Sequence, residues 1–303
     1  MTDIAIIGGG PAGLAASLYA ARGGASVRLI EELFPGGQIV KTHCIENYPG
    51  APDGPDGYAL AARLEEHAAK AGVTPEYAGV VSLRLSESEK EITLSTGETF
   101  AAKAVILCMG ASPRQIGVPG ERELTGKGVS YCATCDGAFY RGRTATVIGG
   151  GDTAISDALY LSRLCKQVYV VHRRDRLRAS AVLANAALQT ENITFVWNSV
   201  PEAFLGTERL TGVRLKNTAT GECSELQTDG VFVAIGIVPR TDLIAGQVAL
   251  ARDGSIETNE RMETSVPGVF AAGDVRNTPL RQVVTACADG AVAATYAIEA
   301  VRV

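Results

Sequence analysis

The sequence predicts an α/β protein made of two Rossmann-like dinucleotide-binding domains of the three-layer ββα type. Three observations predict this fold. A glycine-rich turn follows the short apolar run at 2–7, a second such turn follows the run at 144–148, and the C-terminal strand and helix have no such motif. Because a strand, a glycine turn and a helix in this order form a nucleotide-binding unit, the chain is expected to contain two of these units.

The elements of the two units can be read off in order. The first is expected to contain a strand at 2–7, a glycine turn at 8–13, a helix at 14–22 and a strand at 26–30. The second is expected to repeat this order, with a strand at 144–148, a turn at 149–151, a helix at 153–165 and a strand at 167–171.

The domains are expected to be interleaved. The runs 104–113 and 231–239 are both β-rich and both end in a glycine turn and a proline, as a duplicated unit would. A strand at 269–274 precedes an Ala/Val-rich helix at 282–301. Because this C-terminal piece lacks its own glycine motif, we expect it to complete the first domain. The predicted domains are 1–113 with 241–303, and an inserted domain at 114–240.

Composition restricts the function classes. The chain has 303 residues, 46% hydrophobic and 20% charged, enough for two ordinary cores and unlike a disordered or fibrous protein. A net charge of −5 provides no broad basic surface for nucleic acid. No uninterrupted apolar run reaches the ~20 residues of a membrane span, and the N-terminus has no signal-peptide pattern. We therefore expect a soluble cytoplasmic protein.

The first glycine motif is GxGxxG, formed by Gly8, Gly10 and Gly13. Its glycines permit the turn, the approach of a pyrophosphate and close packing of the helix, whose N-terminus then holds the phosphates. Glu31 follows the next strand, where a carboxylate accepts hydrogen bonds from ribose hydroxyls and repels a 2′-phosphate. The first site is therefore expected to hold FAD or NAD(H).

The second motif has the GxGxxA form and a different ending. It comprises Gly149, Gly151, Asp152, Thr153 and Ala154. The following strand ends in a basic segment that contains His172, Arg173, Arg174 and Arg178. Guanidinium groups bind a dianionic 2′-phosphate through charge-assisted hydrogen bonds, which predicts NADPH rather than NADH. The alternative is a solvated basic helix start, which the upstream glycine turn disfavours.

A CxxC pair at Cys132 and Cys135 is the candidate catalytic centre. Of seven cysteines only these two are close in sequence, which fits a reducing compartment. The pair could be a redox dithiol, half of a zinc site or two structural cysteines. Zinc is disfavoured because neither a second CxxC nor a histidine pair supplies further ligands, and no metal site is expected. A redox dithiol needs a proton donor, and Asp136 could serve.

Seven motifs together resemble the low-molecular-weight thioredoxin reductases over essentially the whole chain. They are GGGPAGL, PGGQ, ENYPG, CATCDGAF, GGGDTA, HRRDRLR, and VFAAGD followed by LRQVV. The resemblance implies an FAD domain, an inserted NADPH domain, a homodimer, and thioredoxin or a thioredoxin-like protein as electron acceptor. Because the cysteine pair lies outside the FAD domain on which it depends for electrons, we also expect the inserted domain to swing about its two connections, near 112–117 and 239–243.

The resemblance also implies residue roles. Cys135 would be the thiol next to the flavin, Cys132 the thiol that attacks thioredoxin, and Asp136 the acid. The expected FAD-binding residues, beyond the first glycine motif and Glu31, are Gly36, Gly37, Gln38, Asn47, Gly273, Asp274, Arg281, Gln282 and Val283. The 2′-phosphate would be held by Arg173, Arg174 and Arg178.

Three other functions compete with this interpretation. A flavin-dependent dithiol oxidase of the same architecture needs no nicotinamide, so the second glycine motif and the arginines argue against it. A non-catalytic NADPH sensor has no use for a CxxC. Reduction of another thioredoxin-like protein cannot be separated from thioredoxin reduction by sequence. Cys44 and Cys287 depart from the family pattern, and we interpret both as packing residues, with an accessory redox role for Cys44 left open.

Overall fold

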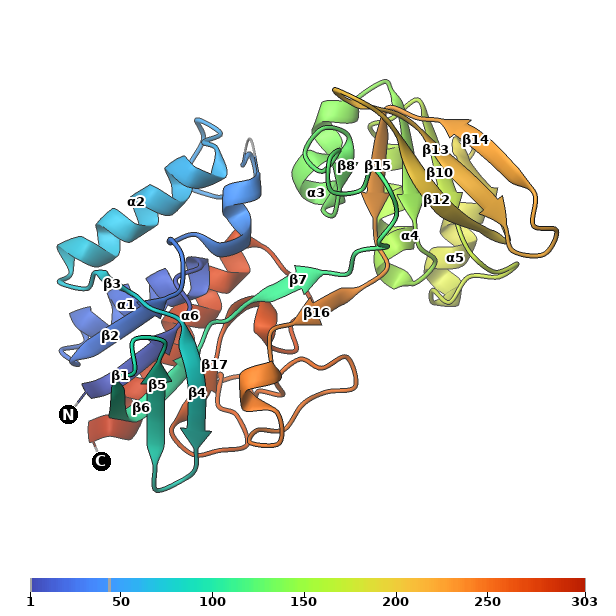
Figure 1. The fold of residues 1–303 in the computed structure, drawn as a ribbon. Helices are drawn as coiled ribbons and strands as arrows, with labels where there is room; N and C mark the ends of the chain where they lie inside the picture. The colour runs from blue at the N-terminus through green and yellow to red at the C-terminus, as the bar shows by residue number, and fades with distance from the viewer. Residues whose placement is uncertain (1, 43–44, 303) are drawn as a thin grey trace. The chain divides into compact units, whose positions relative to one another are not determined.

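The structure is a computed structural model that describes residues 2–42 and 45–302. It divides into two compact units (Figure 1). Unit 1 comprises residues 1–112 and 238–303, and unit 2 comprises residues 113–237. The prediction for Cys44 lies outside the described residues.

Unit 1 is built on a mainly parallel sheet with strand order β3-β2-β1-β6-β5-β4, and with β17 beside β6. The parallel strands are β1 (Thr2–Ile7), β2 (Val27–Glu31), β3 (Pro75–Tyr77), β6 (Thr99–Leu107) and β17 (Val269–Ala271). The strands β4 (Val80–Leu85) and β5 (Lys90–Leu94) pair antiparallel. The C-terminal strand thus joins the first sheet, as its missing glycine motif suggested.

Three layers form unit 1 because its central strands are apolar on both faces. On one face Ile4 and Ile6 pack against three helices, α1 (Pro11–Arg22), α2 (Gly57–Lys70) and α6 (Val283–Arg302). On the other face Ala5 and Ile7 pack against β4 and β5. Figure 1 shows the helices gathered on one side of the strands. This is the ββα arrangement that the sequence predicted.

Helices α1 and α6 pack unusually closely because both present small residues. A Cβ on Gly290 would lie 2.1 Å from the carbonyl oxygen of Ala12, so no larger residue fits. Among the described residues α6 alone is long and apolar enough to cross a membrane, with 20 residues and a mean hydropathy of 1.2. One such helix is weak evidence of a membrane span, and its Gly290 and Ala293 are buried in unit 1.

Unit 2 repeats the three-layer plan. Its parallel sheet has the order β11-β10-β9-β15-β8. The strands are β8 (Val129–Ser130), β9 (Thr144–Ile148), β10 (Gln167–Val171), β11 (Ile193–Val196) and β15 (Gly230–Val233). One face packs against α3 (Ala133–Asp136), α4 (Asp152–Ser162) and α5 (Ala181–Leu188). The other packs against the antiparallel strands β12 (Ser199–Gly206), β13 (Leu210–Asn217) and β14 (Cys223–Gln227).

The two look-alike runs of the sequence each contribute a core strand and a connecting strand. After β6 the chain continues into β7 (Ala111–Pro113), and after β15 into β16 (Ile237–Pro239). The two connecting strands pair with each other in a separate two-stranded sheet. The described residues also form short 3₁₀ helices at η1 (Gly37–Lys41), η2 (Gly137–Tyr140), η3 (Asp242–Ile244) and η4 (Gly273–Val275).

Candidate cofactor sites and redox centre

The first glycine turn lies between β1 and α1, and the structure explains why glycine occupies each of three positions in it. Gly8 has φ of 107°, and a Cβ there would lie 2.4 Å from the carbonyl oxygen of Cys108. A Cβ on Gly13 would lie 1.9 Å from the carbonyl oxygen of Gly8. At Gly10 a Cβ would meet no described atom within 4 Å. Gly8 and Gly13 therefore allow the turn to close, whereas Gly10 leaves the N-terminus of α1 open to a ligand.

Glu31 ends β2 and reaches this turn. Its Oε2 accepts a hydrogen bond from the backbone N–H of Gly9 over 2.7 Å, and its Oε1 accepts one from Leu33 over 3.0 Å. The carboxylate is thereby fixed beside the glycine turn. This is the position of the residue that binds ribose hydroxyls in a Rossmann unit.

The segment that begins at Gly36 folds back onto the same turn. The backbone N–H of Gly36 donates to the carbonyl oxygen of Gly9 over 2.8 Å, and Gly37 and Gln38 start η1 directly afterwards. Further along, the Asn47 side-chain amide donates to Oε1 of Gln282 over 3.0 Å. The structure therefore brings residues that are far apart in the sequence together in unit 1.

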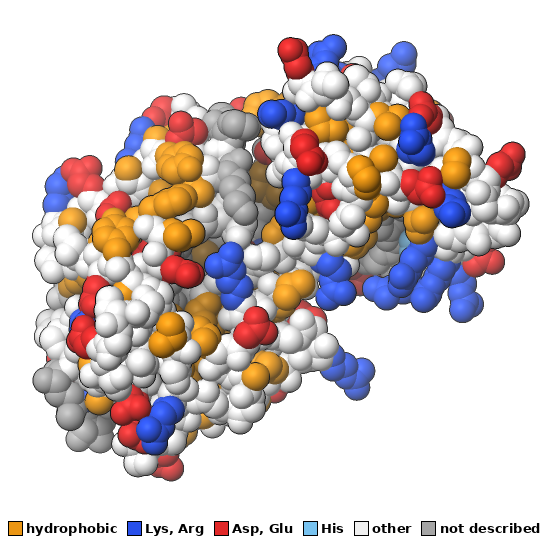
Figure 2. All heavy atoms as spheres, in the orientation of Figure 1, with side chains coloured by type: hydrophobic (Ala, Val, Ile, Leu, Met, Phe, Trp, Pro, Cys, Tyr) orange, Lys and Arg blue, Asp and Glu red, His pale blue; other side chains and the backbone are white. Residues whose placement is uncertain are grey.

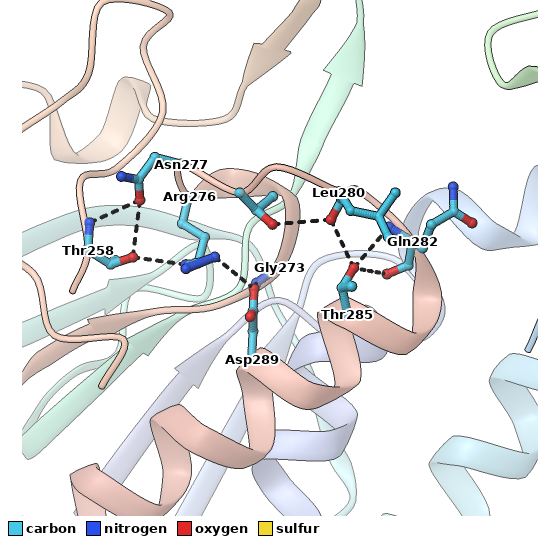
Figure 3. Close-up of polar contacts among 9 residues, drawn as sticks. Thr258, Gly273, Arg276, Asn277, Leu280, Gln282, Thr285 and Asp289 are labelled. Carbon is cyan, nitrogen blue, oxygen red and sulfur yellow. Dashed lines mark hydrogen bonds and ion pairs between the residues drawn. The ribbon is translucent and has the colours of Figure 1, made fainter. Parts of the chain in front are cut away.

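The C-terminal part of this site is held by Asp289 (Figure 3). Asp289 Oδ2 accepts hydrogen bonds from the backbone N–H of Gly273 over 3.1 Å and from Arg276 over 3.4 Å. Asp274 follows Gly273 in η4, and burial raises the pKa of its carboxyl group. The Nε of Arg281 is buried and has no hydrogen-bond partner within the described part of the chain.

Thr285 holds the loop that leads into α6. Its hydroxyl accepts a hydrogen bond from the backbone N–H of Gln282 over 3.1 Å and lies 2.9 Å from the carbonyl oxygen of Leu280 (Figure 3). Val283 begins the helix and, like Ile39 and Tyr48, packs against the buried cluster of Ile45, Ala51 and Leu60. Sequence reasoning missed Thr285 and Asp289, although two polar residues one helical turn apart in an Ala/Val-rich helix indicate a common polar face.

These residues fit FAD. The open N-terminus of α1 suits the pyrophosphate, and the Glu31 carboxylate suits the adenosine ribose, which carries no phosphate. Asp274 accepts no hydrogen bond from any described residue, so its carboxyl group is available to the hydroxyls of a ribityl chain. The unpartnered Nε of Arg281 is a donor for a polar ring edge.

The second glycine turn, between β9 and α4, is equally crowded. Gly149 has φ of 155°, and a Cβ there would lie 2.4 Å from the carbonyl oxygen of Ala234 and 2.7 Å from Cβ of Ala154. A Cβ on Gly150 would lie 2.3 Å from the ring of His172. At Gly151 the nearest described atom to a Cβ is Nη2 of Arg178, at 3.9 Å. As at Gly10, the third position stays open.

The basic loop after β10 lies over this turn. The backbone N–H groups of Arg178 and Ala179 both donate to the carbonyl oxygen of Gly150, over 2.7 and 3.1 Å. The side chains of Arg173, Arg174, Arg176 and Arg178 are exposed. Figure 2 shows Lys and Arg side chains grouped along one edge of unit 2. This loop therefore presents several guanidiniums near a phosphate-binding turn, which fits the 2′-phosphate of NADPH.

Two predicted residues of this site, Asp152 and His172, have structural contacts of their own. Asp152 Oδ1 accepts a hydrogen bond from the backbone N–H of Ser180 over 2.6 Å, so it fixes the start of α5, and its neighbour Thr153 is exposed. The ring of His172 is buried against Gly150. Burial, followed by the nearby arginines, lowers the pKa of His172, which favours the neutral ring. His172 thus supports the turn, and the exposed arginines carry the charge.

The redox centre follows β8 in unit 2. Cys132 and Cys135 form a disulfide with a Cα–Cα distance of 5.3 Å at the start of α3, and both residues are partly exposed. Asp136 ends α3 and accepts a hydrogen bond at Oδ2 from the hydroxyl of Ser130 over 2.6 Å. A disulfide next to a carboxyl group can accept two electrons and exchange protons with the acid.

Comparison with known proteins identifies the family. Residues 2–290 match the family described as pyridine nucleotide-disulphide oxidoreductase. The chain belongs to this family. Members named thioredoxin reductase from Peptoclostridium acidaminophilum and Bacillus subtilis (strain 168) are 47% and 44% identical, over 97% and 96% of this chain and 95% and 92% of theirs. The structure of thioredoxin reductase from Streptococcus pyogenes MGAS5005 is 41% identical, covers 100% of this chain and 98% of its own, and superimposes with a TM-score of 0.91.

The remaining cysteine that departs from the pattern has packing contacts in this pyridine nucleotide-disulphide oxidoreductase. Cys287 on α6 is half-buried, and its thiol lies 3.7 Å from the carbonyl oxygen of Pro11 and 3.9 Å from the Tyr48 hydroxyl. Burial raises the pKa of Cys287, which keeps the thiol protonated and weakly nucleophilic. These contacts fit the packing interpretation.

Sequence reasoning missed two polar residues of this oxidoreductase that lie around the CxxC. Ser130 contacts Asp136, and Glu121, only 1% exposed, accepts a hydrogen bond from the hydroxyl of Tyr131 over 2.8 Å. Both lie in the segment before the cysteines, where neither a spacing rule nor a glycine motif marks them. Only their burial identifies them.

Proposed function

We propose that this chain is a thioredoxin-disulfide reductase that passes electrons from NADPH through FAD and the Cys132/Cys135 disulfide to thioredoxin. The proposal is supported by three features that occur together in one chain. They are a disulfide-bonded CxxC with an adjacent acid, a dinucleotide site with a carboxylate at the ribose position, and a second dinucleotide site with arginines at that position. A single reductase needs all of these parts, whereas a sensor or an oxidase needs only some of them.

The charge of the residues at the ribose position assigns a cofactor to each dinucleotide site. We place FAD in unit 1, where Glu31 ends β2, because a carboxylate there accepts hydrogen bonds from a ribose without a 2′-phosphate. We place NADPH in unit 2, where Arg173, Arg174 and Arg178 are exposed beside the second glycine turn. The residues named above for each site would line the corresponding cofactor.

The chemistry uses the cysteines in two roles. The residues of unit 1 would hold FAD, which would supply two-electron transfer between NADPH and the disulfide. Reduction breaks the Sγ–Sγ bond, and the two sulfurs take up one proton each, one of them from Asp136. Each sulfur gives up its proton again before it attacks, one of them to the Asp136 carboxylate, and these protons end on the two thioredoxin sulfurs. The Cys132 thiolate then attacks one sulfur of the thioredoxin disulfide, forming a mixed disulfide and releasing the other sulfur as a thiol. The Cys135 thiolate attacks Cys132, which restores the internal disulfide and frees reduced thioredoxin.

The proposal includes a swing of unit 2. Because the NADPH residues and the dithiol both belong to unit 2 while the FAD residues belong to unit 1, nicotinamide and dithiol would reach the flavin in turn. We place the hinge at the two connections, near 112–117 and 239–243. A crosslink that joins the two units should abolish turnover, and a verified crosslinked protein with full activity would exclude the swing.

The assembly and the setting are also part of the proposal. We infer a homodimer in the cytoplasm, without membrane or nucleic-acid partners. Size-exclusion chromatography with light scattering tests the dimer: a mass of twice the 31.6 kDa chain is expected, and a monomer under assay conditions would contradict it.

The function is tested by a disulfide-reduction assay. Purified protein should be yellow and should reduce a disulfide with NADPH only when thioredoxin is added. Replacement of Cys135 by Ser should abolish this activity, and undiminished reduction by that variant would refute the mechanism. Fast NADPH-driven reduction without thioredoxin would indicate another acceptor, and nicotinamide-independent consumption of oxygen with a small dithiol would indicate an oxidase.

A further inference from the structure

We propose that Ser130 is a positioning residue that holds the Asp136 carboxyl group for proton exchange with the cysteine pair. The inference rests on the proposed function, because it assigns a residue to the acid of that reaction. It concerns only atoms of unit 2, from β8 to the end of α3.

The contacts of the Ser130 hydroxyl join the acid to the dithiol segment. The hydroxyl lies 2.6 Å from Oδ2 of Asp136 and accepts a hydrogen bond from the backbone N–H of Cys132 over 3.1 Å. One buried oxygen thus contacts both the carboxyl group and the backbone of the first cysteine. Ser130 itself is only 6% exposed, so water competes little for these bonds.

The hydroxyl has one proton and two acceptors within reach. The carbonyl oxygen of Cys132 lies 3.4 Å away, compared with 2.6 Å for the carboxyl oxygen of Asp136. A short hydrogen bond to an ionised acceptor is about twice as strong as a neutral one. The hydroxyl proton of Ser130 is therefore donated to Asp136, and the hydroxyl oxygen accepts a hydrogen bond from the backbone N–H of Cys132.

The backbone around Ser130 is held in place on both sides. Val129 is 1% exposed and pairs with Val231 of β15. The Tyr131 hydroxyl donates to Oε1 of Glu121, a carboxylate that also accepts from the backbone N–H of Gly117 over 2.6 Å. The serine therefore cannot follow a displaced Asp136, and it can act as a fixed point for the acid.

The backbone that carries Asp136 is also held by its packing against α4. Gly137 follows Asp136, and a Cβ there would lie 2.9 Å from Cε1 of Tyr160 and 3.0 Å from Cδ2 of Leu161 on α4. The turn that carries the carboxyl group therefore lies directly on α4. With α4 on one side and Ser130 on the other, the carboxyl group keeps one orientation relative to the disulfide.

This arrangement has a chemical consequence. When the disulfide is reduced, Asp136 gives a proton to a sulfur and becomes a carboxylate, and when the dithiol is oxidised by the acceptor it takes a proton back. A donated O–H stabilises the ionised form of a carboxyl group. Ser130 thus stabilises Asp136 in the state in which it has just delivered its proton, and it fixes the direction of delivery.

Replacement of Ser130 by Ala is the test, with Ser199 replaced by Ala as the matched control. Ser199 is also 6% exposed in a unit 2 strand, but its hydroxyl donates to the carbonyl oxygen of Trp197. We expect S130A to slow NADPH-driven thioredoxin reduction about tenfold, a modest part of what acid catalysis supplies. The limb of its pH–rate profile that the Asp136 carboxyl group governs should move to higher pH, and S199A should change neither this limb nor the rate.

A double-mutant cycle separates positioning from a structural effect. In a background with Asp136 replaced by Asn, S130A should cost less than about twofold, because the group through which Ser130 acts is already lost. An equal loss in both backgrounds, or a pH profile of S130A that matches wild type, would overturn the proposal. If S130A does not fold, S130T, which keeps the hydroxyl, takes its place. A wild-type rate and pH profile for S130T would support the proposal. A loss of rate as large as that of D136N would overturn it.

Failure of the proposed function gives a different result. NADPH-driven reduction of ferricyanide, which can take electrons from a flavin without the dithiol, should be unchanged in S130A. If wild-type protein reduces ferricyanide but not thioredoxin, the thioredoxin assignment fails. If wild type reduces both and S130A equals S199A in both, the function stands and the role of Ser130 is refuted.

Discussion

The Oε2 of Glu31 accepts a hydrogen bond from the backbone N–H of Gly9 over 2.7 Å, which fixes the carboxylate at the end of β2 to the glycine turn. The relationship explains how one residue can specify a cofactor. A free carboxylate would have to be ordered by the ribose, whereas this one is already oriented, and its charge excludes a 2′-phosphate from the site.

Replacement of Glu31 by Ala should therefore weaken FAD binding. The loss of a charge-assisted hydrogen bond to ribose corresponds to about 1.5–3 kcal/mol, or about a tenfold to hundredfold rise in Kd. Flavin fluorescence during dialysis measures the retained cofactor. The adjacent Glu32, which is exposed, serves as control, and E32A should retain flavin as wild type does. Equal flavin retention by E31A and wild type would contradict the assignment of the first dinucleotide site.

Two glycines of the first turn should respond differently to Ala. G13A places a methyl group where the carbonyl oxygen of Gly8 lies 1.9 Å away, so it should lower the free energy of unfolding by about 3 kcal/mol or more. G10A meets no described atom within 4 Å, so it should fold normally but lose FAD, because its methyl group occupies the pyrophosphate position. Denaturant unfolding and flavin absorbance distinguish the two, and a G10A protein with full flavin content would refute this role of Gly10.

The basic loop of unit 2 should set the preference for NADPH over NADH. Replacement of Arg173 or Arg178 by Ala should raise KM for NADPH about tenfold or more and leave KM for NADH nearly unchanged, because only NADPH has the 2′-phosphate. Arg163, exposed at the end of α4, is the matched control. Steady-state kinetics with both nucleotides measure the effect. A proportional rise in both KM values would show that these arginines support the fold instead.

Asp157 on α4 should make stability depend on pH. Burial raises the pKa of its carboxyl group to about 7 from 3.8, so the folded protein keeps it neutral at a pH where the unfolded chain ionises it. The stability contribution is complete below about pH 4 and is lost as pH rises to about 7. Asp157 replaced by Asn should therefore be more stable than wild type at pH 8, by about 2 kcal/mol, and similar at pH 4. Denaturant unfolding at both pH values checks this, and a constant difference would contradict it.

Sequence analysis identified the parts of the fold that repeat a local rule. Both strand–turn–helix units lie where the glycine motifs predicted them. The motifs are informative because few residues other than glycine fit the crowded and open positions of such a turn. Helix α1 begins at Pro11, three residues before the predicted start, since proline suits the first helical position. The helix predicted to reach Cys165 ends at Ser162.

Long-range contacts could not be read from the sequence. The Asn47–Gln282 hydrogen bond joins residues 235 positions apart, and only the resemblance placed both in one site. Ser130 escaped notice because serine is common and its role depends on which carboxyl group faces it after folding. The burial of the His172 ring against Gly150 could not be read from the sequence either, because it depends on how the glycine turn packs after folding.

In the proposed mechanism, NADPH reduces the Cys132/Cys135 disulfide through FAD within one chain. Mass spectrometry after anaerobic incubation with NADPH and alkylation of free thiols tests it most directly. In the FAD-loaded protein, Cys132 and Cys135 should become alkylated with NADPH and remain unlabelled without it. In protein freed of FAD, they should stay unlabelled in both conditions. A pair that remains oxidised in the FAD-loaded protein with excess NADPH would contradict the account.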